Sequence, residues 1–144
     1  MRRKDLNVPA LLLEAVVIIL SIGYMIMQVV YGIYYRRGAG VIVMNCLVML
    51  LLYAFFTLLS IYPERVNRIP LELCQGKIRK LTLWMIRVEK LIFSAGLVIP
   101  CVFDVLGKEI PTASSLILVA VMILVAAGFE WAIIKELRNH FNKQ

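Results

Sequence analysis

The sequence contains one histidine, His140, and it stands in the polar segment at the C-terminal end. Histidine is the usual base of nucleophilic triads and a common zinc ligand. The chain also has no H-E-x-x-H sequence, no P-loop and no glycine-rich nucleotide-binding turn. We therefore expect no catalytic residues, no metal site, no cofactor-binding site and no enzyme activity. An enzyme that uses only carboxylates, or one that modifies lipids, is the lesser alternative.

Cysteine is also scarce, with only Cys46, Cys74 and Cys101, and no C-x-x-C pair is present. An odd number of cysteines cannot pair completely within one chain. Cys46 and Cys101 are expected at similar depths near the outer ends of their helices. A disulfide between them needs Cα atoms about 4.4–6.8 Å apart. The favoured interpretation is that they are small buried hydrophobic residues, and a bridge is the alternative.

Charge is low for a protein of 144 residues: 17% of the residues are charged and 62% are hydrophobic. A soluble globular protein is nearer to half apolar. The mean hydropathy is +0.87. The apolar residues form long runs, and no charge at all occurs between Gly38 and Pro63. A helix of about 20 apolar residues crosses the roughly 30 Å hydrocarbon core of a bilayer. The composition therefore indicates an integral membrane protein.

The run lengths predict an all-α integral membrane fold with four transmembrane helices, arranged as two antiparallel hairpins in one domain, residues 1–144. The spans are expected at about residues 8–35, 41–61, 81–106 and 113–135, with a basic loop over residues 62–80. The first run follows MRRKD, as in a secretory signal, but it is too long for one. We expect it to be an uncleaved signal anchor. The glycines of Arg36–Gly40 permit a tight reversal, so the first two helices should be antiparallel.

The lysines and arginines are unevenly distributed among the connections, and the formal net charge is +7. Eleven lie in the tails and the middle loop: Arg2, Arg3, Lys4, Arg65, Arg68, Lys77, Arg79, Lys80, Lys135, Arg138 and Lys143. Three lie in the other two connections: Arg36, Arg37 and Lys108. In membrane proteins the connections rich in lysine and arginine lie on the cytoplasmic side. We expect a multi-pass protein of the plasma (inner) membrane with both termini cytoplasmic, anionic lipid headgroups as partners on the cytoplasmic side, and no nucleic-acid partner.

Five ionisable residues fall within the predicted spans at comparable depth in the cytoplasmic leaflet: Glu14, Arg87, Glu89, Lys90 and Glu130. Charge inside a membrane is expensive, so it is a functional candidate by default. The third span has only an uncharged stretch over residues 91–103 and must include its charged part to cross. We expect an intramembrane charge cluster in which Glu14 and Glu130 face Arg87 or Lys90. In the alternative, the two cations snorkel to the headgroups while the acids sit near the interface.

These features favour a non-enzymatic membrane subunit, anchor or regulator that acts through a protein partner or through self-assembly. Its basic cytoplasmic face would comprise Arg65, Arg68, Lys77, Arg79 and Lys80. The alternative is a small proton-coupled transporter or ion channel that uses Glu14 and Glu130. Glu14 in the first of four helices resembles the small multidrug resistance family, whose first-helix glutamate is essential. The family's other motifs are absent here, and the basic middle loop and charged third helix depart from its pattern.

Overall fold

The computed structural model describes residues 7–111 and 113–141, and within these ranges helices are the only regular secondary structure. Four long helices follow in order: α1 (Val8–Tyr34), α2 (Ala39–Ile61), α3 (Gly76–Val105) and α4 (Ser114–Phe141). A short 3₁₀ turn, η2 (Pro63–Arg65), follows α2. The terminal charges used in the orientation argument, Arg2, Arg3, Lys4 and Lys143, lie outside the described residues. The prediction of an all-helical chain with four helices is confirmed.

The helices begin and end where the sequence supplies turn residues. Pro9 lies in the first turn of α1, where its missing N–H is not needed. The backbone of Arg36 is left-handed, with φ 49°, and reverses the chain into α2. Gly76 has φ 54° and opens α3, so the middle connection ends at residue 75 rather than at 80. The basic residues over 77–80 are therefore helical rather than part of a loop.

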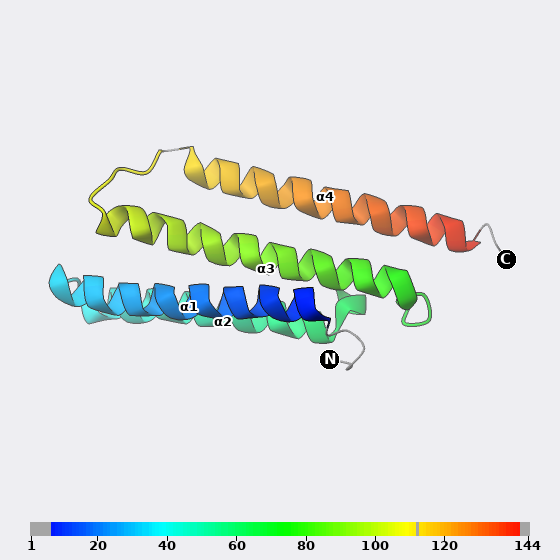
Figure 1. Cartoon of the computed structure of the whole chain (residues 1–144), viewed down its shortest axis with the longest axis horizontal. Helices are drawn as coiled ribbons and strands as arrows, with labels where there is room; N and C mark the ends of the chain where they lie inside the picture. Colours follow the sequence, from blue (N-terminus) through cyan, green and yellow to red (C-terminus); the bar gives the residue numbers. More distant parts are fainter. Residues whose placement is uncertain (1–6, 112, 142–144) are drawn as a thin grey trace.

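α3 is the central helix of the molecule. It packs against α1 and α2 on one side and against α4 on the other, and the extensive contacts of α4 are all with α3 (Figure 1). α1 and α2 form one helical hairpin, and Gly32 of α1 lies directly against the side chain of Ile42 of α2. The four helices therefore form three layers, with α3 in the middle, rather than a closed square bundle.

Three of the helices, α1, α2 and α4, are long and apolar enough to cross a membrane. Each of them exposes many large hydrophobic side chains, and these form the surface expected to face lipid. α3 is long enough to cross a membrane but is not apolar enough, because Arg87, Glu89 and Lys90 lie in its middle. These three charged residues are among those that α3 buries. The chain is thus a small polytopic membrane protein whose central helix carries the charge.

α3 is one continuous helix of 30 residues that passes through Pro100 without a break. The start of α3 also extends well beyond the N-terminal end of α1 (Figure 1). A small core fills this end of the molecule: Ile69 and Cys74 of the middle connection pack with Ile78 of α3 and Ile133 of α4. We call these four residues the end core. It ties the middle connection and the last turns of α4 to the start of α3.

One glycine sets how closely α4 approaches α3. A Cβ atom at Gly96 would collide with the side chain of Leu118, whereas the space around Gly128 is open. We expect Gly96→Leu to lower the free energy of unfolding by about 1–3 kcal/mol, because overpacking forces the two helices apart. Gly128→Leu is the matched control and should leave stability unchanged or raise it slightly. Thermal unfolding in detergent, followed by circular dichroism, compares the two, and equal stability would contradict this packing.

Candidate functional site

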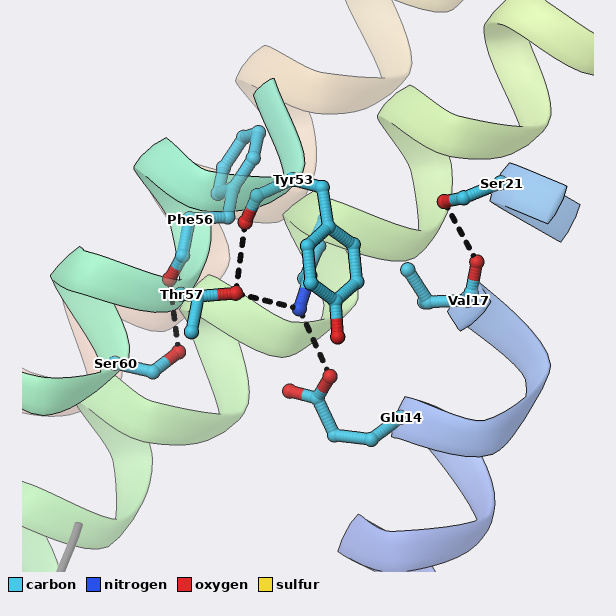
Figure 2. A network of polar contacts seen from close by, with 8 residues as sticks. Glu14, Val17, Ser21, Tyr53, Phe56, Thr57 and Ser60 are labelled. Atoms are coloured by element: carbon cyan, nitrogen blue, oxygen red, sulfur yellow. Dashed lines mark hydrogen bonds and ion pairs between the residues drawn. The ribbon is translucent and has the colours of Figure 1, made fainter. Parts of the chain in front are cut away.

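The polar centre of the molecule is the ammonium group of Lys90 on α3. Its Nζ donates to Glu14 Oε2 of α1 at 2.8 Å and to Thr57 Oγ1 of α2 at 3.1 Å. It also lies 3.7 Å from the centre of the Tyr53 ring of α2. We call Glu14, Tyr53, Thr57 and Lys90 the lysine site. It joins three helices at one point (Figure 2).

The helix geometry brings these groups together. Tyr53 and Thr57 are four residues apart, so they share one face of α2. The Thr57 hydroxyl donates to the Tyr53 carbonyl oxygen at 2.7 Å, which leaves its lone pairs for the ammonium (Figure 2). Two acceptors and a ring face therefore surround a group that has three donors. The Lys90 side chain is only 1% exposed, and that of Glu14 is 19% exposed.

The expected charge cluster is brought together in part. Glu14 and Lys90 form the ion pair, and the side chain of Lys90 turns into the bundle instead of snorkelling to the surface. Arg87 lies one turn earlier on α3 and is also buried. Glu89 is buried as well, and its Oε1 has no hydrogen-bond partner within residues 7–111 and 113–141. Of the three α3 charges, Lys90 alone enters the lysine site.

Glu130 does not join the lysine site. It is on α4, which packs on the face of α3 opposite α1, so the helix in the middle separates it from Glu14. Its side chain is half-buried, and no contact in the described part of the chain links it to Lys90. The sequence placed Glu14 and Glu130 in one cluster because both were expected at the same depth, but depth alone does not give the order of the helix layers.

The five residues of the expected basic face are engaged to different degrees. Lys77 forms an ion pair with Glu136 at 2.9 Å, and Arg79 lies 4.0 Å from Glu64. Arg65 stacks over the Tyr62 ring at 4.9 Å. Arg68 and Lys80 are exposed. The acids of the same region thus neutralise part of the positive charge that the sequence count suggested.

A second polar chain crosses the bundle farther along the helices. Asn45 of α2 donates to the Gln28 side-chain carbonyl of α1 at 2.9 Å, and Gln28 Nε2 approaches Cys101 Sγ of α3 at 3.5 Å. The role of Gln28 and Asn45 here is to join helices. All three cysteines are free thiols, and Cys74 and Cys101 are buried. The disulfide alternative for Cys46 and Cys101 is therefore not present.

The arrangement is suited to holding helices together. A fully enclosed ammonium with a carboxylate, a hydroxyl and an aromatic face has its donors occupied, and an ion pair of this kind is broken only at high cost. Among the described residues, no group of three or more histidine, cysteine or acidic side chains is placed to hold a metal ion. Tyr53 and Thr57 were not expected in the charge cluster, because that cluster was drawn from the charged residues of the spans alone.

Comparisons with known proteins give no relative: no family model, curated protein or solved structure matches this chain.

Proposed function

We propose that this protein is a non-enzymatic membrane subunit in which α1, α2 and α3 form a fixed unit and α4 presents the surface for a protein partner or a second copy. All four helices cross the membrane in this proposal, α3 with its charges enclosed by its neighbours. The observation that carries it is the closed lysine site, which joins α1, α2 and α3 but not α4. Apart from the end core, α4 packs on α3, so most of its surface remains for other chains.

Site-specific crosslinking tests the α4 surface. Leu124 of α4 and Leu51 of α2 are both strongly exposed. A photocrosslinking amino acid at Leu124 should give one discrete protein adduct in native membranes, and the same group at Leu51 should give lipid adducts only. The mass of the Leu124 adduct distinguishes a second copy from another protein. Equal patterns at both positions would contradict the assignment to α4.

The second candidate function is a proton-coupled transporter or ion channel that uses Glu14 and Glu130. It is favoured by the partial exposure of Glu14 beside an enclosed Lys90, since the acid of a carrier must be reached by its proton. Protein reconstituted in liposomes should move protons or a cation under this alternative, and Glu14→Gln should abolish the flux. Under our leading proposal the liposomes show no flux above protein-free controls.

We further propose that both termini and the middle connection face the cytoplasm of a plasma (inner) membrane, because lysine and arginine favour that side by eleven to three. Cys74 is a poor reporter, since its side chain is enclosed in the end core and burial raises the pKa of its thiol. Leu71 is exposed in the same connection. In a cysteine-free background, Leu71→Cys should react with an impermeant maleimide only after the cytoplasmic side is opened. Lys108→Cys should react in intact cells, and the reverse pattern would overturn this topology.

A further inference from the structure

The C-terminal end of α1 carries a groove whose shape and chemistry match a lipid. It has a volume of about 370 Å³ and is lined almost entirely by apolar side chains and tyrosine rings: Ile26, Met27, Val30, Tyr31, Tyr34 and Tyr35, with Val105 of α3 on its far wall. Ile26 and Tyr34 are eight residues apart. At about 1.5 Å per residue the groove is roughly 12 Å long, close to the hydrocarbon depth of one leaflet.

That length selects the occupant. A groove of this length offers a partner transmembrane helix contact in one leaflet only, whereas an acyl chain lies wholly within one leaflet. The tyrosines gather at one end of the groove, at the level where amphipathic rings meet headgroups. The Tyr31 ring lies 4.3 Å from the Tyr35 ring, and the Tyr34 ring lies 5.0 Å from it. The groove is therefore apolar along its length, and the three tyrosine rings form its mouth.

The mouth is held in place by contacts between α1 and α3. The Tyr31 hydroxyl donates to the backbone carbonyl oxygen of Asp104 at 2.8 Å. The Arg37 guanidinium stacks over the same Tyr31 ring, with its Cζ 5.1 Å from the ring centre. It also lies 3.8 Å from Asp104 Oδ2, and both side chains are substantially exposed. Such an exposed pair is weak, so the guanidinium can accept a second anion.

We propose that this groove binds one phospholipid of the leaflet that contains the 35–38 turn, with an acyl chain along Met27 and Val30 and its phosphate on the Arg37 guanidinium. A guanidinium presents five donors in a fork that fits phosphate oxygens. The adjacent Arg36 adds positive charge at the same turn. The assignment concerns a different surface from α4 and does not depend on the proposed function of the chain.

Native mass spectrometry of delipidated protein titrated with phosphatidylglycerol tests the groove. Val30→Trp fills it, and Val29→Trp adds the same side chain to the same turn of α1 outside the groove. We expect the wild type and Val29→Trp to retain one lipid per chain. Val30→Trp should bind at least about tenfold more weakly, and so should Ile26→Trp as a second groove variant. Both groove positions are exposed, so unfolding temperatures should stay unchanged.

The headgroup contact has its own test. Arg37→Gln should weaken phosphatidylglycerol binding by about tenfold, because it removes a charge-assisted hydrogen bond. Inorganic phosphate lacks an acyl chain and should not displace the lipid at concentrations that leave the protein folded. Equal lipid binding by Val30→Trp, Ile26→Trp and Val29→Trp would overturn the proposed groove. Displacement by inorganic phosphate, or unchanged binding by Arg37→Gln, would overturn the pairing of headgroup and chain.

Discussion

Replacing Lys90 by methionine should lower the free energy of unfolding by about 3–5 kcal/mol. The substitution keeps the length of the side chain and removes the ammonium, so Glu14 loses its 2.8 Å ion pair and Thr57 loses its donor. A carboxylate left partly enclosed without a cation is costly. Reversible unfolding in mixed detergent micelles, followed by the helical circular dichroism signal, measures the loss.

Two further variants test whether the loss of stability comes from the Glu14–Lys90 ion pair or from helix packing in general. Glu14→Leu alone should also destabilise, because it leaves the Lys90 charge enclosed. The double variant Glu14→Leu/Lys90→Met should be closer to the wild type than either single variant, since replacing both ions by apolar groups is often neutral. Additive losses in the double variant would show that the two residues are not coupled.

Glu89→Gln is the matched control on the same helix. Glu89 is buried next to Lys90 in sequence, but its Oε1 makes no hydrogen bond within the described ranges. The amide keeps the shape of the side chain and removes no ion pair of the lysine site, so we expect a change of less than about 1 kcal/mol. A loss as large as that of Lys90→Met would mean that any buried charge on α3 matters equally.

The second large effect is expected at Ile133. Truncation to alanine should lower the free energy of unfolding by about 2–5 kcal/mol, because it opens a cavity in the end core. Ile133 is the α4 member of that core, where it packs with Ile69, Cys74 and Ile78. The same denaturation experiment measures the loss. Cys74 provides a local readout, since it should become reactive toward maleimides when the core loosens.

The adjacent Ile134 is the control for Ile133. It is exposed on the other side of α4, so Ile134→Ala should change stability by less than about 0.5 kcal/mol. Both substitutions remove the same atoms from the same helix turn, and they differ only in what the side chain contacts. Similar losses of stability for Ile133→Ala and Ile134→Ala would contradict the assignment of Ile133 to the end core.

The sequence was sufficient for the number of helices and for Glu14 and Lys90 as charged candidates. Long uncharged runs define α1, α2 and α4, because few other structures tolerate them. The charges in the first half of α3 left two alternatives, burial in a cluster or snorkelling to the headgroups. The cluster alternative predicted that Glu14 would meet a cation of α3, and the structure places Lys90 there.

Other features depend on rotation and layer order, which a single sequence does not specify. Arg87 and Lys90 are three residues apart and share much of one helix face, so periodicity did not decide which one meets Glu14. Glu130 was expected beside Glu14 because both lie near the same depth. The position of α3 between α1 and α4 separates them, and that order follows from packing at Gly96 and in the end core.

The charged middle of α3 has a consequence for how the chain enters the membrane during synthesis. Each lysine, arginine or acid at a helix centre costs about 2.5–3.5 kcal/mol for insertion through the translocon. α3 carries three such residues, so it is a poor insertion signal on its own. α1 and α2 emerge first and bring Glu14 and Thr57, the acceptors that compensate Lys90. Insertion of α3 should therefore depend on the helices made before it, and a chain that begins after α2 should leave α3 outside the bilayer.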